Sequence, residues 1–264
     1  MALNLNTSEA LTRDASGTIN ELIILSRIDG KIERLSKSII DSIDNHKDSM
    51  PEMDLVKYKR ILFSILNPST LKRDIRAIIS NRDYQKSLEK IVSFLDRSLV
   101  KQITEREEAA KSPDAMKGIQ RFFDNLKTSP PTDERKLLIE HIDKVRNLSS
   151  TAIDANCEIF QAIAWGMRRY LVNDKVMTSN QLKQIRSDRQ KQIEAFLKEQ
   201  VLISMLYAYK NTSDSDLKSY ILLCETSAGK LANKFIQLAY QLMVKKMAKQ
   251  LQDKLGDEFD SCHA

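Results

Sequence analysis

Two short pairs of residues in this chain have the types and the spacing of a nucleophile beside its base. Ser98 and Lys101, and again Ser227 and Lys230, match the Ser-x-x-Lys motif of serine penicillin-binding enzymes. In that motif the lysine lies one helical turn from the serine and removes its proton. The Lys-Thr-Gly motif that accompanies it does not occur in this sequence. A hydrolase with a site near Ser227 and Lys230 is therefore only an alternative hypothesis.

Other catalytic and metal-binding patterns are missing from the sequence. The three histidines are His46, His141 and His263. None of them forms a His-Glu-x-x-His pair, whose two ligands must share one helix face. A Gly-x-Gly-x-x-Gly loop and a Walker loop, which would surround phosphate with backbone donors, are also missing. We therefore expect no metal, no cofactor and no catalytic residue, and we interpret His141 as a surface group rather than a general base.

The cysteines do not form a framework. Cys157, Cys224 and Cys262 are too few and too scattered for a disulfide scaffold or a zinc site. Because their number is odd, at least one of them is free or bonded to another chain. Their pairing is left open by the sequence.

Two segments of the chain are copies of one pattern. Residues 87–101 and 216–230 align with an offset of 129 positions, as from Leu88 to Leu217. The same offset pairs Val92 with Ile221, Asp96 with Glu225, Ser98 with Ser227 and Lys101 with Lys230. A weaker match with an offset of 114 places Ile28 on Ile142. These matches predict an internal duplication, in which each copy has an apolar face that its neighbours must cover.

Composition and periodicity predict an all-α protein of two similar helical-bundle halves. The chain has 264 residues, of which 30% are charged, and only 6 Gly and 5 Pro. Apolar residues recur every three or four positions, which predicts helices over 19–43, 55–65, 71–79, 83–103, 113–126, 132–164, 180–210 and from 214 onward. The stretch Lys127–Pro131 reads as a linker. The predicted domains are a polar arm at 1–16, a first repeat domain at 17–128 and a second at 129–264.

The second copy of the pattern resembles a bacterial family. Asp216-Leu217 followed by Glu225-Thr226-Ser227-Ala228-Gly229-Lys230 is similar to the Glu-Ser-Pro-Ala-Gly-Lys signature of the Domain of Unknown Function 2059 family, which an acidic Glu-Leu precedes. Residues 20–26 and 103–110 resemble its opening helix and a mid-chain segment. This sequence departs from the pattern with Thr226-Ser227 in place of Ser-Pro and, in the first copy, Leu99-Val100 in place of Ala-Gly. The resemblance implies a helical, usually exported protein of an uncharacterised family, and it transfers no catalytic residues.

The signature contains a glycine where the pattern is helical. The positions that we single out are Leu217, Glu225, Ser227, Ala228, Gly229 and Lys230. Glycine costs about 1 kcal/mol against alanine inside a helix. Gly229 therefore predicts that the helix turns a corner here or that another backbone passes close to it. A ligand site at Ser227 or Lys230 is the alternative.

The last predicted helix has the most suggestive surface. Between Lys230 and Leu255 its apolar residues cover more than half of the circumference, so it needs burial on several sides. A central core helix, a dimer contact and a hydrophobic groove for a protein partner all fit this pattern. Lys245, Lys246 and Lys249 make an anionic membrane surface an alternative partner. Nucleic acid is disfavoured because the basic residues are not interleaved with stacking aromatics.

Charge and hydropathy leave the compartment open. The net charge is +6, from 42 Lys plus Arg against 36 Asp plus Glu, which is a weak indication of anionic partners. No run approaches the roughly 18 apolar residues of a membrane span, and the start lacks the layout of a signal peptide. Together with the family resemblance, this predicts a non-catalytic helical binding or structural protein, periplasmic or secreted, with a cytoplasmic location still open.

Overall fold

The computed structural model describes residues 17–43, 51–80, 82–166, 168 and 178–260. Every regular element in these ranges is an α-helix, which confirms the predicted all-α class. None of the described helices combines the length and the apolar character that a membrane-spanning segment needs. The predicted polar arm at 1–16 lies outside the described residues.

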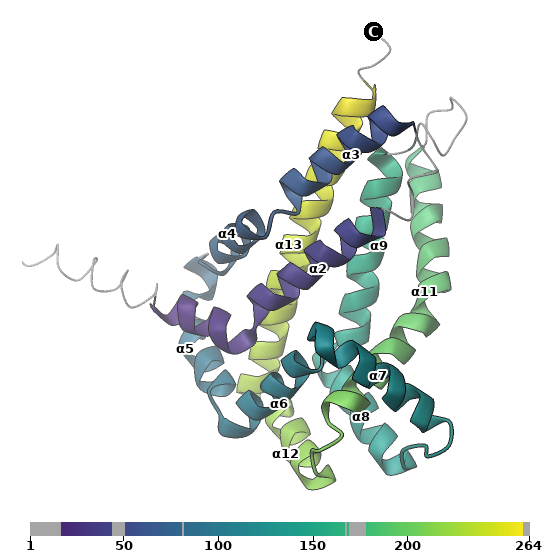
Figure 1. Cartoon of the computed structure of the whole chain (residues 1–264). Coiled ribbons are helices and arrows are strands. Elements are labelled where there is room, and N and C mark those ends of the chain that lie inside the picture. The colour runs from purple at the N-terminus through teal and green to yellow at the C-terminus, as the bar shows by residue number, and fades with distance from the viewer. Residues whose placement is uncertain (1–16, 44–50, 81, 167, 169–177, 261–264) are drawn as a thin grey trace, which may run out of the picture. The chain divides into compact units, whose positions relative to one another are not determined.

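The helices are short at the start of the chain and long at its end (Figure 1). In chain order they are residues 17–26, α2 (Ile28–Ile43), α3 (Glu52–Ile65), α4 (Pro68–Ile79), α5 (Arg82–Leu95), α6 (Ser98–Ala109), α7 (Pro113–Leu126), α8 (Asp133–Arg146), α9 (Leu148–Gly166), α11 (Ser179–Ala208), α12 (Asp214–Glu225) and α13 (Ser227–Asp260). Side-chain oxygens cap several of these helices by accepting a backbone N–H of the first turn. They include Asn67 for α4, Ser112 for α7, Thr132 for α8, Thr178 for α11, Ser213 for α12 and Thr226 for α13.

The chain divides into two compact units, each built from three separate stretches. Unit 1 contains Met1–Ile28, Ile79–Ser149 and Leu197–Leu238. Unit 2 contains Asp29–Ile78, Ser150–Phe196 and Ala239–Ala264. The predicted boundary between residues 128 and 129 falls inside the middle stretch of unit 1. The compact units are thus interleaved along the chain, and the division into two consecutive repeat domains stays a prediction.

Unit 1 is organised around the parallel neighbours α8 and α12. Glu134 of α8 accepts from Nζ of Lys218 of α12 at 2.7 Å. Seven residues further along both helices, Nε2 of His141 lies 2.9 Å from Oε1 of Glu225. Beneath these two surface pairs lies an apolar core, which includes Leu22, Leu88, Ile91, Leu95, Val100, Ile103, Leu138, Ile139, Ile142, Leu217, Ile221 and Ala232. One apolar stripe from each helix is therefore removed from water, which is the main contribution to stability.

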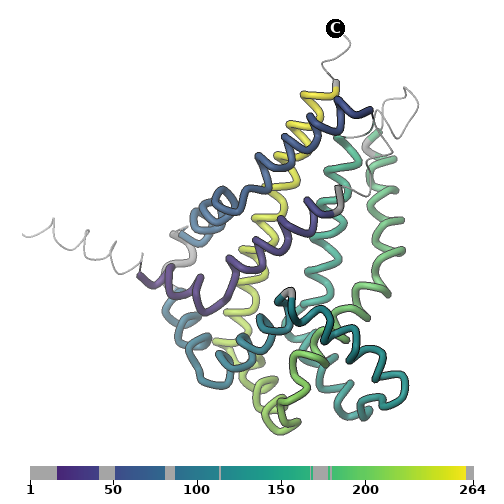
Figure 2. Tube along the Cα trace, viewed as in Figure 1, coloured from purple at the N-terminus to yellow at the C-terminus, as the bar shows by residue number. Residues whose placement is uncertain are grey.

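Unit 2 contains nearly all of α2, α3 and α4 and most of α9, together with part of α11 and the last part of α13. Figure 2 shows α3 beside the end of α13. The two run antiparallel, because Arg60 meets Glu258 while the later Ser64 meets the earlier Lys254. Within the core, Gly166 of α9 lies so close to Leu255 of α13 that a Cβ there would overlap the leucine side chain.

Two predicted long helices are each broken by a single left-handed residue. Arg27, with φ of 52°, separates residues 17–26 from α2, so the continuous helix predicted over 19–43 is wrong. Asn147, with φ of 51°, separates α8 from α9, so the continuous helix predicted over 132–164 is wrong as well. Apolar spacing cannot reveal such a break, because the stripe resumes directly after one residue. The two breaks are 120 positions apart, and the weaker match with an offset of 114 does not align them.

Both repeat copies also bend, and they do so at equivalent positions. The first copy changes from α5 to α6 after Arg97, and the second from α12 to α13 after Thr226. The single helix predicted over 83–103 is therefore wrong. The bend residues themselves are 129 positions apart, and so are Ser98 and Ser227, where the next helices begin. This agreement supports the predicted duplication, which remains an interpretation of the sequence.

Candidate functional site

The signature residues lie at the corner between α12 and α13. Leu217 is fully buried, Glu225 ends α12 beside His141, and Ser227 is the exposed first residue of α13. Ala228 is half-buried, Gly229 is buried and Lys230 is exposed. Their side chains thus point in different directions and do not converge on one site.

Gly229 allows this corner to be tight. A Cβ at this position would overlap the carbonyl oxygen of Leu223 and lie 2.7 Å from that of Cys224. The N–H of Gly229 donates to the hydroxyl of Thr226 at 3.1 Å, so Thr226 caps α13. Of the two alternatives that the sequence predicted, the structure shows the corner, and the backbone close to Gly229 is that of the end of α12 itself.

Neither Ser-x-x-Lys pair has the geometry of a nucleophile and its base. No hydrogen bond joins Ser227 to Lys230, and both side chains are exposed. In the first copy Lys101 donates to Asp96 at 2.9 Å, while Ser98 accepts from Gln102 at 3.2 Å. Proton removal from serine needs the base within hydrogen-bond reach of the hydroxyl.

A buried polar cluster that the sequence reasoning missed lies in unit 1. Glu107 of α6 makes a bidentate ion pair with Arg146 of α8, and Nη2 donates to Oε2 at 3.2 Å. The hydroxyl of Tyr209, at the end of α11, donates to the same carboxylate. Only 11% of each charged side chain is exposed, and Tyr209 is fully buried. Three helices therefore meet at one carboxylate, which receives donors from both of the others.

The cluster holds its charges in place electrostatically. Burial by itself would raise the pKa of Glu107, but the opposing charges of Arg146 and Lys111 and the hydrogen bonds from Arg146 and Tyr209 lower it to about 2. Burial and the neighbouring carboxylate raise the pKa of Tyr209 well above its usual value. At neutral pH the carboxylate is thus ionised and the phenol is protonated.

A phenol and a thiol of α12 border the cluster. The guanidinium of Arg146 lies 5.8 Å from the ring centre of Tyr220. One helical turn later is Cys224, a free and buried thiol whose pKa is raised by burial. A buried thiol with a raised pKa remains protonated and is a poor nucleophile. The arrangement therefore positions helices rather than activating a reacting group.

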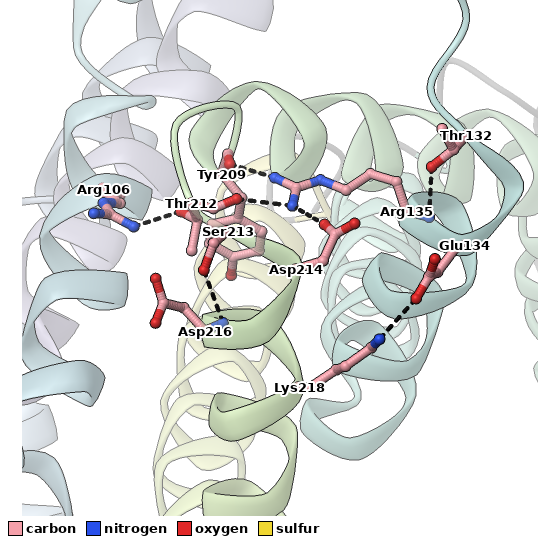
Figure 3. A network of polar contacts seen from close by, with 10 residues as sticks. All are labelled: Arg106, Thr132, Glu134, Arg135, Tyr209, Thr212, Ser213, Asp214, Asp216 and Lys218. Carbon is pink, nitrogen blue, oxygen red and sulfur yellow. Dashed lines mark hydrogen bonds and ion pairs between the residues drawn. The ribbon is translucent and has the colours of Figure 1, made fainter.

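A second arginine organises the neighbouring loop (Figure 3). Arg135, in the first turn of α8, donates to the backbone oxygens of Tyr209 and Thr212 and pairs with Asp214. From the other side Arg106 of α6 donates to the hydroxyl of Thr212. Backbone carbonyl groups of the loop that follows α11 thereby gain side-chain donors. The connection from α11 to α12 is fixed from two sides.

With the structure known, one feature of the sequence can be seen to mark the members of the cluster. Glu107 follows Ile103 by four residues, and Arg146 follows Ile142 by four, so each charge continues an apolar stripe. A lone charge on a buried stripe needs a partner of opposite sign. The pattern cannot name that partner, because the spatial proximity of α6 and α8 is a tertiary property.

The remaining candidates are dispersed. In the part of the chain that the structure describes, no group of three His, Cys, Asp or Glu residues could hold a metal ion. Cys157 and Cys224 are free and buried, whereas His46, Cys262 and His263 lie outside the described residues.

The three lysines of the last helix are exposed in unit 2. Lys246 pairs with Asp74 of α4 at 2.8 Å, and Lys249 pairs with Asp253 one turn later. The apolar residues around them, such as Met243 and Met247, are buried in the core of the unit. This part of α13 is thus a core helix with an exposed basic edge, and its apolar face is not available for insertion into a membrane.

Comparisons with known proteins give no relative. No protein-family model matches the chain, and neither the search of curated proteins nor that of solved structures returned a significant match. The family resemblance stays a prediction, and the function has to be argued from the arrangement of the residues.

Proposed function

We propose that this protein is a non-catalytic helical binding or structural protein. The observation that carries the proposal is the pairing of Glu107 with Arg146 and Tyr209 beneath the surface of unit 1. These groups have strongly shifted pKa values, which in an enzyme are typical of catalytic residues. Here each of them is satisfied by another helix of the same unit, and the pairing fixes α6, α8 and α11 together. Structural ion pairs perturb pKa values in the same way.

The alternative of a hydrolase near Ser227 and Lys230 has less support. A serine becomes a nucleophile only when a base accepts its proton. Ser227 is at the start of α13 and Lys230 is exposed one turn later, without a hydrogen bond between them. The conformation at Gly229 is explained by helix packing and a cap alone.

A location in the bacterial envelope is part of the proposal. It rests on the resemblance of residues 216–230 to an exported family. Fractionation of cells that express the gene with its native start would test it. Recovery of the protein only with cytosolic markers would contradict an envelope location.

A covalent serine probe tests the absence of catalysis. We expect the intact mass of the protein to stay unchanged after incubation with a fluorophosphonate, because Ser227 has no base within reach. The variant Ser227→Ala is the matched control and should behave identically. Stoichiometric labelling that disappears in the Ser227→Ala variant would contradict the non-catalytic role and support the hydrolase alternative.

A further inference from the structure

Helix α3 of unit 2 has an apolar stripe on its exposed side. Met53, Val56 and Phe63 are 75%, 62% and 51% exposed, although the opposite face of the same helix is buried in the core. Isolated exposed apolar residues are ordinary, but three on one face of one helix are unusual. The helix therefore has an inner apolar face that stabilises the unit and an outer one without a structural role in it.

An excess of positive charge surrounds this stripe. Residues 52–74 contain five basic residues, which are Lys57, Lys59, Arg60, Lys72 and Arg73, and three acidic ones, which are Glu52, Asp54 and Asp74. In residues 245–258 of α13 the basic ones are Lys245, Lys246, Lys249 and Lys254, against three acidic ones. Together the two segments have nine basic and six acidic residues, an excess of three charges in a chain whose total is +6.

The fold places these two segments next to each other. Glu258 pairs with Arg60 at 3.4 Å, and Nζ of Lys254 lies 3.3 Å from the hydroxyl of Ser64. At the other end Lys246 pairs with Asp74. These contacts make α3, α4 and the last part of α13 neighbours, and the exposed residues of these three helices are treated together as one face of unit 2.

We propose that this face binds an anionic lipid bilayer, with Met53, Val56 and Phe63 entering the headgroup region. The inference rests on the proposed binding function and names its partner. Three side chains are too few for a stable protein interface, which buries roughly 800 Å² on each partner. A bilayer adds the attraction of many headgroups to each basic residue, and a short apolar stripe is enough to anchor the contact.

Sedimentation with vesicles tests the proposal. We expect the protein to sediment with vesicles that contain phosphatidylglycerol and to remain in solution with pure phosphatidylcholine, with weaker binding at high salt. Neutralising Arg73 and Lys245 together, as Arg73→Gln and Lys245→Gln, should weaken binding by about 25-fold, since each basic residue contributes about fivefold. Replacing Val56 and Phe63 with serine should weaken it by about tenfold.

Matched variants in unit 1 test whether weaker binding is specific to this face or follows from any loss of surface charge or apolar surface. Lys117 and Lys144 are exposed, and Leu137 and Leu222 are 64% and 66% exposed. The double variants Lys117→Gln with Lys144→Gln, and Leu137→Ser with Leu222→Ser, should bind like the wild type. Thermal unfolding of every variant verifies that it is folded, and all of these positions are on the surface.

Four results would overturn the bilayer proposal. They are no sedimentation with anionic vesicles, equal binding to both kinds of vesicle, equal weakening by the unit 1 control variants, and binding of soluble poly-glutamate as tightly as vesicles, which would indicate an acidic protein partner. Failure to bind vesicles without labelling by the fluorophosphonate leaves the non-catalytic role in place. Labelling of Ser227 by the fluorophosphonate would contradict the non-catalytic role, whether or not the protein sediments with vesicles.

Discussion

The corner between α5 and α6 and the corner between α12 and α13 have the same backbone pattern with different side chains. In the first, the N–H of Arg97 donates to Phe94 at 3.3 Å, and that of Lys101 donates to Arg97 at 2.9 Å. In the second, the equivalent N–H groups of Thr226 and Lys230 make the equivalent bonds at 3.2 and 2.9 Å. The burial pattern also agrees at most positions across 88–103 and 217–232.

The side chains that stabilise the two corners differ. The first corner has Val100 where the second has Gly229, and Arg97, whose side chain makes no cap, where the second has the cap Thr226. The buried side of the second corner has the phenol of Tyr220 beside Arg146, whereas the equivalent position of the first copy is the apolar Ile91. The same backbone conformation is therefore stabilised by apolar packing at the first corner. At the second corner it is stabilised by a cap, a glycine and a neighbouring polar cluster.

The largest expected effect comes from breaking the polar cluster that borders the second corner at Tyr220. Arg146→Met keeps most of the volume but leaves the carboxylate of Glu107 buried without a countercharge. We expect the free energy of unfolding to fall by 3–5 kcal/mol in urea denaturation, as is typical for one half of a buried pair. The triple variant Glu107→Leu, Arg146→Met and Tyr209→Phe should regain most of the loss, because it leaves no polar group without a partner. No loss in the single variant would show that the cluster is not structural.

Acid should weaken the second corner through the same carboxylate. The pKa of Glu107 is about 2 in the folded protein and 4.5 ordinarily, so its contribution is complete above pH 4.5 and is lost as the pH falls toward 2. The shift corresponds to about 3 kcal/mol. Other carboxylates titrate in this range, so the measurement is the difference between the wild type and the triple variant across pH 5 to 2. Parallel stability curves would contradict the assignment.

An alanine at the same position of both corners tests the role of the glycine. Gly229→Ala adds a methyl group against the last carbonyls of α12 and should cost about 2 kcal/mol despite the better helix propensity of alanine. Val100→Ala removes two buried methyl groups and should cost about 1–2 kcal/mol by leaving a cavity. Crystal structures of both variants would separate overlap from cavity, and a stabilised Gly229→Ala protein would refute the tight corner.

The smallest effect concerns the caps. Thr226→Ala removes the acceptor for the N–H of Gly229 and should cost about 1 kcal/mol. Arg97→Ala at the equivalent position of the first corner should change the stability by less than about 0.5 kcal/mol, since the exposed side chain makes no cap. Thermal unfolding followed by circular dichroism measures both. Equal effects would mean that the two corners are capped in the same way.

The sequence by itself determined the helical class and the need for an unusual backbone conformation at Gly229. These properties are local, because helix periodicity and glycine cost depend on residues within one or two turns. The sequence did not predict the helix breaks at Arg27 and Asn147. A single left-handed residue interrupts the helix, but the apolar residues continue at the same spacing on either side of it.

Only the tertiary structure decided which distant residues meet. The apolar spacing of α6 and α8 shows that Glu107 and Arg146 continue buried stripes, but their pairing depends on how the helices pack. The division into interleaved units and the joining of α3 to the end of α13 are also set by packing, between segments nearly 200 residues apart. Long-range contacts of this kind arise from burying all stripes at once, which no single stretch of sequence specifies.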